Sequence, residues 1–150
     1  IRDRMEFEAI DYTVVHVRLG DYLERHIDTI GVISPKSLIK FLEESDLLNK
    51  CKNFLVSDAK EIEQLEPLVP YFDDVMLSNQ YGSWETFKII ANAKNIVTAN
   101  STFSWWAARI ALEKNSSIWI PQNWVKNSEL VGQYVDLKDP RMNSYENDFL

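Results

Sequence analysis

The stretch that decides the fold is "NIVTANSTFSWWAARIALEKNSSIWIP", residues 95–121. It begins with a short apolar run rich in β-branched residues (95–99) and continues into a longer apolar segment (102–114). A second short apolar run (117–121) ends it. Short runs of this composition are typical of buried strands, and the segment between them has the length of a helix. The stretch therefore predicts a β-α-β unit, in which a helix joins two parallel strands.

The same alternation extends outward over most of the chain. Further strands are predicted at 13–17, 53–57 and 74–78, and further helices at 34–48, at 83–93 and, shorter and polar, at 60–66. Ser34 and Ser83 are the expected N-caps of the two longer helices, and Pro35 suits a first helical position. This alternation predicts an α/β fold, a Rossmann-like parallel sheet flanked by helices on both faces.

No repeat or linker divides the chain, so residues 1–150 are predicted to form one domain. After Pro121 the periodic pattern dissolves, and residues 141–150 are expected to form an irregular polar tail. The chain opens "IRDRMEFEAIDY", which has neither an initiator methionine nor the pattern of a signal peptide. We therefore interpret this start as a cut into a longer protein.

Composition excludes several classes of partner. The formal net charge of -7 argues against a broad surface for nucleic acid or anionic membrane, because both need a cationic field. Cys51 is the only cysteine, so no internal disulfide forms and a reducing, cytoplasmic location is expected. No apolar run reaches the length of a transmembrane helix. Peripheral contact with a membrane stays open as an alternative.

The stretch "VVHVRLGDYLERH" (14–26) carries charge at the end of a predicted strand. In an open parallel sheet, ligands bind outside the carboxyl ends of the strands. The guanidinium of Arg18 suits bidentate contact with a phosphate, and His16 and Asp21 lie close to it in sequence. Plainer interpretations are a surface ion pair between Arg18 and Asp21 and a half-buried, hydrogen-bonded His16.

A second strand end lies in "TANSTFSWW" (98–106). Asn100, Ser101 and Thr102 stand where a helix begins, and they can present N–H groups and hydroxyls to an anion, aided by the helix dipole. The alternative is that Ser101 or Thr102 only caps the helix. Both strand ends belong to one edge of the predicted sheet, so they can face one diphosphate.

The sequence shows no pattern that is typical of a metal-binding site. His16, His26 and Cys51 lack metal-ligand spacing, and no Asp-x-Asp triplet occurs that could hold a divalent ion against a diphosphate. No metal site is therefore predicted. The sequence also contains neither G-x-G-x-x-G nor G-x-x-x-x-G-K-[ST], the motifs of dinucleotide and P-loop sites, and no cofactor is predicted.

Four motifs resemble those of family 11 glycosyltransferases, the α-1,2-fucosyltransferases. "HVRLGDY" (16–22) resembles their His-x-Arg-Arg-Gly-Asp-Tyr motif, and "VSDA" (56–59) resembles their Phe-Ser-Asp-Asp segment. "ANSTFSWWAARIAL" (99–112) resembles their Ser-Asn-Ser-Ser-Phe-Ser-Trp-Trp-Gly-Ala signature, and "IPQNW" (120–124) resembles the Pro-x-x-Trp that comes after it. The four motifs occur in the family's order over most of the chain.

The resemblance implies the C-terminal, donor-binding domain of a GT-B glycosyltransferase, with the acceptor domain expected before Ile1. The implied reaction transfers L-fucose from GDP-fucose to a hydroxyl of a galactoside or another glycan acceptor. It inverts the anomeric centre and needs no metal. Another nucleotide sugar, or a non-catalytic nucleotide-binding module, are the alternatives.

The resemblance also implies roles for single residues. Arg18 resembles the Arg that contacts the β-phosphate, and His16 the neighbouring His near the nucleotide. Asp21 matches the motif's Asp, which orients Arg18 or approaches the acceptor; the general base is Asp21 or a residue outside this chain. The loop implied to receive the diphosphate and nucleoside consists of Asn100, Ser101, Thr102 and Phe103.

The chain departs from the family pattern at two positions. Leu19 replaces the second Arg of the first motif. Thr86 stands where many members carry an Asp, and Glu85 is the neighbouring acid that could substitute for it. The second departure concerns recognition of the base or ribose.

Overall fold

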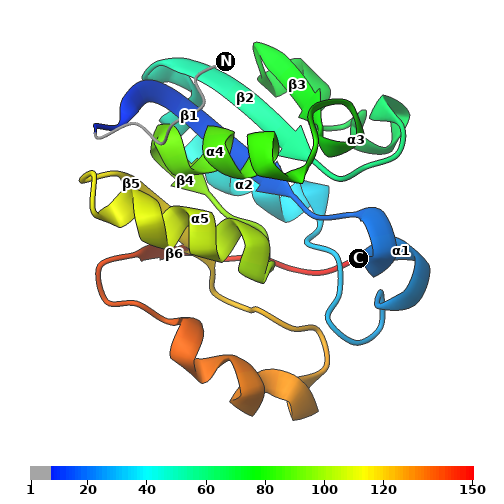
Figure 1. Cartoon of the computed structure of the whole chain (residues 1–150). Coiled ribbons are helices and arrows are strands. Elements are labelled where there is room, and N and C mark those ends of the chain that lie inside the picture. The colour runs from blue at the N-terminus through cyan, green and yellow to red at the C-terminus, as the bar shows by residue number, and fades with distance from the viewer. Residues whose placement is uncertain (1–7) are drawn as a thin grey trace.

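The structure is a computed structural model that describes residues 8–150, without the side chains of residues 134–136. Within these residues, six strands form one sheet in which every neighbouring pair is parallel (Figure 1). The strands are β1 (Ile10–Val17), β2 (Lys52–Ser57), β3 (Asp74–Leu77), β4 (Ala93–Val97), β5 (Ser117–Pro121) and β6 (Asn143–Tyr145).

The strand order is β3-β2-β1-β4-β5-β6. The chain therefore builds one half of the sheet outward from β1, then returns to place β4 on the other side of β1. Val14 lies beside Ile96 and Val15 beside Val97, so the carboxyl ends of β1 and β4 are neighbours. This reversal of strand order is the place where open α/β sheets bind ligands.

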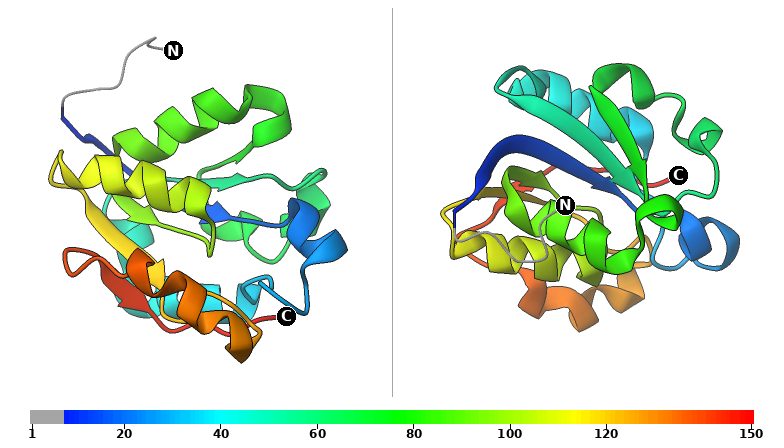
Figure 2. Two further views of the ribbon diagram at one scale, coloured as in Figure 1. Left: turned by 60° about the horizontal axis from the view of Figure 1, so that its bottom comes forward. Right: turned by 45° about the horizontal axis from the view of Figure 1, so that its top comes forward.

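Helices cover both faces of the sheet, as predicted. Figures 1 and 2 show α4 (Ser83–Asn92) and α5 (Thr102–Leu112) side by side on one face, and α2 (Pro35–Ser45) on the other. Two apolar cores result, because neighbouring strand residues point to opposite faces. Val14 packs in the core of α4 and α5, and Val15 packs in the core of α2.

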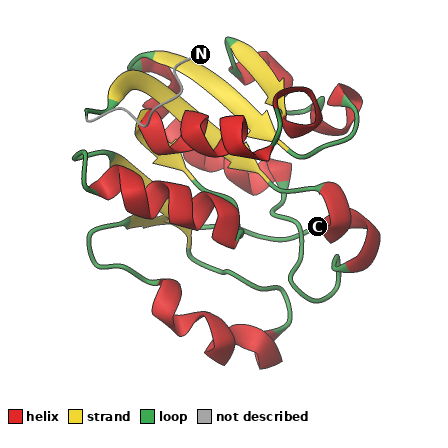
Figure 3. Ribbon diagram, in the orientation of Figure 1, coloured by secondary structure: helices red, strands yellow, loops and turns green. Residues whose placement is uncertain are grey.

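The remaining helices are short and connect the larger elements (Figure 3). They are α1 (Gly20–Arg25), α3 (Ser78–Tyr81) and the 3₁₀ segments η1 (Leu47–Asn49), η2 (Ile62–Leu65), η3 (Val69–Tyr71) and η4 (Ser128–Leu137). The structure confirms the predicted strands and longer helices to within a few residues. The helix predicted to run to residue 48 ends at Ser45, because Asp46 has a left-handed backbone with φ of 57°.

The C-terminal prediction is wrong. Residues 141–150 are not an irregular tail, because they contain β6, which pairs with β5 and forms the edge of the sheet. Tyr145 is buried, its ring stacks on Phe41, and its hydroxyl donates to the carbonyl of Thr98 at 2.7 Å. A three-residue strand with one buried ring is too short to show a periodicity, so the pairing with β5 decides it.

The predicted N-caps are only partly confirmed. Ser34 occupies the N-cap position of α2, with Pro35 in the first turn, but its hydroxyl makes no capping hydrogen bond. Ser83 is the first helical residue of α4, and Gly82 is the N-cap with φ of 78°. A positive φ favours glycine, which explains the shift by one residue.

Candidate functional site

Arg18 comes directly after β1 and is held between two carboxylates. Its Nη2 donates to Oδ1 of Asp21 at 2.7 Å, and its Nη1 lies 3.1 Å from Oδ2 of Asp58. The guanidinium also stands 5.2 Å from the centre of the Tyr22 ring. The side chain remains 28% exposed, so a ligand can reach it. The predicted ion pair with Asp21 is present, and a second partner accompanies it.

Asp58 belongs to the motif at 56–59, but its sequence position alone did not predict a role for it. Besides pairing with Arg18, its Oδ1 accepts a hydrogen bond from the N–H of Leu19 at 2.7 Å. A Cβ on Gly20 would stand 2.3 Å from its Oδ2, so any larger residue there would force the Asp58 carboxylate to shift. The contact between Asp58 and Arg18 follows from the parallel register of β1 and β2. This register sets Val17 beside Ser57, and so brings together the residues that come after the two strands.

His16 lies on β1, two residues before Arg18, and is buried rather than half-buried. The side chain is almost fully enclosed, and its ring lies 6.0 Å from that of Phe103 on α5. Burial, and secondarily the charge of Arg18, lower the pKa of His16 to about 3. The imidazole is therefore neutral at physiological pH, and it contributes shape and hydrogen-bonding capacity to the site.

Asn100, at the second strand end, is buried inside the protein. Its Nδ2 donates to the main-chain carbonyls of Ile30, Gly31 and Trp124 at 3.4, 3.0 and 3.1 Å. Its own carbonyl accepts a hydrogen bond from the hydroxyl of Tyr22 at 3.2 Å. The side-chain amide of Asn100 thus links the segment at Ile30 and Gly31 to the segment at Trp124. The sequence did not predict this role.

The N-terminus of α5 completes the second strand end. Ser101 occupies the N-cap position and is buried, but its hydroxyl makes no capping hydrogen bond. Thr102 is exposed at the first turn, and Phe103 is half-buried behind it. The first N–H groups of a helix have no intrahelical partner, and the helix dipole favours an anion beside them. A diphosphate oxygen suits this position.

The two strand ends meet at one place. Figure 1 shows α1 beyond the end of β1, on the side toward which the first turn of α5 points. In the described part of the chain, the buried side-chain polar atoms without a hydrogen-bond partner are His16 Nδ1, Arg18 Nε, Thr98 Oγ1 and Asn100 Oδ1. All four belong to these two strand ends. Because buried polar groups are normally satisfied, this concentration supports a site for a polar ligand.

Glu85 and Thr86, at the second departure from the family pattern, lie near the start of α4. The hydroxyl of Thr86 donates to the carbonyl of Gly82 at 2.7 Å, so it is bonded within its own helix. Glu85 forms an ion pair of 2.7 Å with the buried Lys88. Trp84 stands 60% exposed and stacks on Phe87, whose ring in turn meets Phe103 edge-on. The sequence pattern did not predict a role for Lys88 or Trp84.

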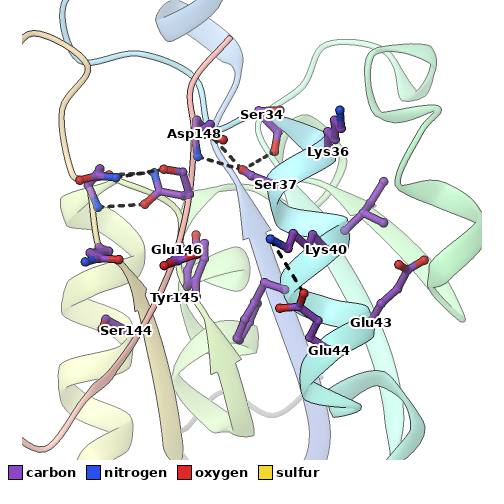
Figure 4. Close-up of a pocket in the computed structure, with 15 residues that line it drawn as sticks. Ser34, Lys36, Ser37, Lys40, Glu43, Glu44, Ser144, Tyr145, Glu146 and Asp148 are labelled. Atoms are coloured by element: carbon purple, nitrogen blue, oxygen red, sulfur yellow. Dashed lines mark hydrogen bonds and ion pairs between the residues drawn. The ribbon is translucent and has the colours of Figure 1, made fainter.

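A hollow lies outside this region, between α2 and the C-terminal segment (Figure 4). It has a volume of about 870 Å³ and includes Lys40 and Glu44, which pair at 4.0 Å. Its charged side chains carry both signs, and none of the predicted site residues lines it. We therefore place the candidate site at the ends of β1 and β4.

Two further properties concern the described residues only. Within them, no cluster of three or more His, Cys, Asp or Glu side chains is arranged to hold a metal ion. None of their helices combines the length and apolarity needed to cross a membrane.

Comparison with known proteins identifies the family. Neither a curated protein nor a solved structure matches the chain significantly. The sequence model of glycosyl transferase family 11, in contrast, matches residues 4–138, which contain all four motifs and the site described above. The Rossmann-like parallel sheet agrees with that family. The chain therefore belongs to glycosyl transferase family 11, and its membership supports glycosyltransferase activity of the fucosyltransferase type.

Proposed function

We propose that the chain binds GDP-fucose and takes part in the transfer of L-fucose to a hydroxyl of a galactoside or another glycan acceptor. One observation carries the proposal: Arg18 and the first turn of α5 lie at the neighbouring ends of β1 and β4. This pair offers a fixed positive charge and free helical N–H groups to one diphosphate.

The chemistry needs such a pair. As the bond between the sugar and the β-phosphate breaks, negative charge builds up on the diphosphate. Hydrogen bonds that strengthen as this charge develops lower the barrier more than they tighten substrate binding. A hydrogen bond to a charged group is worth about 1.5–3 kcal/mol, so Arg18 and the α5 N–H groups together supply several such increments.

The proposed reaction inverts the configuration at the fucose. The acceptor hydroxyl attacks the anomeric carbon from the side opposite the diphosphate, which converts the β-linked donor into an α-linked product. A base removes the proton of that hydroxyl. Asp21, whose side chain is 46% exposed on the first turn of α1, is one candidate for this base, and a residue outside this chain is the other.

We further propose that the chain is the donor-binding half of a two-domain GT-B enzyme. The strand order and the ligand edge between β1 and β4 support this arrangement. Acceptor contacts would then come from another domain, and His16, Ser101, Thr102 and Phe103 would border the nucleotide. Asn100 would act through the loops that it ties together.

The test is nucleotide binding followed by transfer. Thermal unfolding of the purified protein is measured with GDP, UDP and ADP, because a ligand stabilises only the fold that binds it, by about 2.7 kcal/mol at 100 times its Kd. Stabilisation by GDP, with fucose transfer from GDP-fucose by the full-length enzyme, supports the proposal. Stabilisation by UDP or ADP alone indicates another donor, and binding without transfer indicates a non-catalytic module.

A further inference from the structure

Arg18 is an unusual starting point for an anion site, because two carboxylates already hold it. Asp21 accepts from Nη2, and Asp58 faces Nη1. One guanidinium thus faces two carboxylates, and the cluster has a net negative formal charge. A diphosphate approaching this cluster meets repulsion unless one carboxylate gives way.

The two carboxylates differ in how firmly they are held. Asp58 is 17% exposed, also accepts from the N–H of Leu19, and packs directly against Gly20. Asp21 is 46% exposed, and its carboxylate has no hydrogen bond other than that to Arg18 in the described part of the chain. The pair of Arg18 with Asp21 is only partly buried, and ion pairs that solvent reaches are worth little, about 0–1 kcal/mol, so Asp21 can exchange for another anion.

We propose that Asp58 is a positioning residue that holds Arg18 in place, and that Asp21 is the counter-ion that the diphosphate displaces. The proposal rests on the proposed function, since it concerns the same site. On binding, a diphosphate oxygen replaces the Asp21 carboxylate at Nη2 of Arg18. The contacts of Nη1 with Asp58 and of the guanidinium with the Tyr22 ring stay in place. The arginine therefore stays oriented throughout binding.

Two substitutions separate this idea from simple electrostatics. Asp21→Asn and Asp58→Asn each remove one negative charge beside Arg18, so charge alone predicts tighter anion binding for both. The proposal predicts opposite effects. Removing the competitor Asp21 should tighten binding of inorganic pyrophosphate and of GDP about two- to fivefold. Removing Asp58 should weaken it about tenfold, because Arg18 loses the partner that fixes it.

The experiment is isothermal titration calorimetry of the purified protein at low and high salt, with the thermal midpoint of each variant measured in parallel. The gain in Asp21→Asn should shrink at high salt, since it is electrostatic, while the loss in Asp58→Asn should persist. If Asp58→Asn binds pyrophosphate and GDP more weakly while its thermal midpoint equals that of wild type, Asp58 does more than stabilise the fold.

Glu24→Gln is the matched control. Glu24 also lies on α1 and carries a negative charge, but it pairs with Lys60 and does not contact Arg18. The affinity of this variant for pyrophosphate should stay within about twofold of wild type.

The outcomes are distinguishable. A wild-type protein that binds GDP, with Asp21→Asn unchanged or weaker, overturns the inference and leaves the proposed function standing. Tighter binding in Asp58→Asn overturns it as well. If Asp58→Asn does not fold, the comparison of Asp21→Asn with Glu24→Gln decides the matter. A wild-type protein that binds neither pyrophosphate nor GDP overturns the inference together with the proposed function.

Discussion

The hydroxyl of Tyr22 donates to the main-chain carbonyl of Asn100 at 3.2 Å, although 78 positions separate the two residues. Tyr22 belongs to α1, beyond the first strand end, and Asn100 belongs to the turn before α5. This bond therefore joins the two halves of the candidate site directly. Groups that are already in place need little reorganisation during a reaction, which is how an enzyme stabilises developing charge.

Arg18 should be indispensable for transfer. In the full-length enzyme, Arg18→Ala is expected to reduce kcat about 10²–10³-fold, by analogy with the loss of one oxyanion-hole donor. Arg18→Lys should also lose most activity, because an ammonium cannot reproduce the fork that contacts Asp58 and a phosphate together. Steady-state kinetics with GDP-fucose measure both variants. Turnover near that of wild type in Arg18→Lys would refute the assignment.

A side chain at Gly20 should disturb the pairing of Asp58 with Arg18. An added Cβ would stand 2.3 Å from Oδ2 of Asp58, so Gly20→Ala should push Asp58 away from Arg18 and weaken GDP binding. We expect a loss of affinity of about tenfold, measured by calorimetry, together with a lower thermal midpoint. Gly132→Ala is the control, because a Cβ there meets nothing within 4 Å. Equal behaviour of the two variants would contradict the packing argument.

Asn100 should matter chiefly for stability. Its Nδ2 serves three main-chain carbonyls, so Asn100→Ala is expected to destabilise the fold by about 1–3 kcal/mol, and Asn100→Asp, which has no donor, by more. Urea unfolding measures both. Asn79→Ala, which removes one exposed hydrogen bond to a carbonyl, should stay within about 0.5 kcal/mol of wild type. A stable Asn100→Ala with weak GDP binding would instead indicate direct contact with the donor.

His16 should make the protein sensitive to acid. Its pKa is lowered to about 3 in the folded state, from 6.5, so below pH 6.5 the unfolded chain binds a proton that the folded chain excludes. Stability should therefore fall as the pH drops from 6.5 toward 3, by about 2 kcal/mol between pH 7 and pH 5 from this residue alone.

His16→Gln should remove that part of the pH dependence, and His26→Gln, which removes the other histidine, should retain it. Urea unfolding at pH 7 and pH 5 makes the comparison. The same pH dependence in wild type and His16→Gln would show that the buried imidazole is not its source.

Fucose transfer should continue in excess EDTA. In the proposed mechanism, Arg18 and the N-terminus of α5 meet the charge of the leaving diphosphate, and the sequence contains no Asp-x-Asp triplet to hold a divalent ion against it. Activity of the full-length enzyme with and without chelator is the measurement. Loss of activity on chelation, restored by Mn²⁺, would count against this mechanism.

Much of the fold could be predicted from local pattern. The apolar runs at 13–17, 53–57, 74–78, 95–99 and 117–121 each overlap a strand of the structure, and the longer amphipathic or apolar segments between them form helices. The placement of Arg18 and Ser101 at strand ends came from the same pattern, because successive βα units put the residues after each strand at one edge of the sheet.

Tertiary structure decided which of these ends are neighbours. The return of the chain to place β4 beside β1, the approach of Asp58 to Arg18 and the burial of Asn100 among three carbonyls involve residues far apart in sequence. The same holds for β6, whose three residues form a strand only because β5 offers a free edge. Hydrophobic periodicity indicates which side chains face the core, and it can be recognised within one short segment of the sequence. Strand order and hydrogen-bond partners depend on the whole chain packing around one sheet, so only the three-dimensional structure contains them.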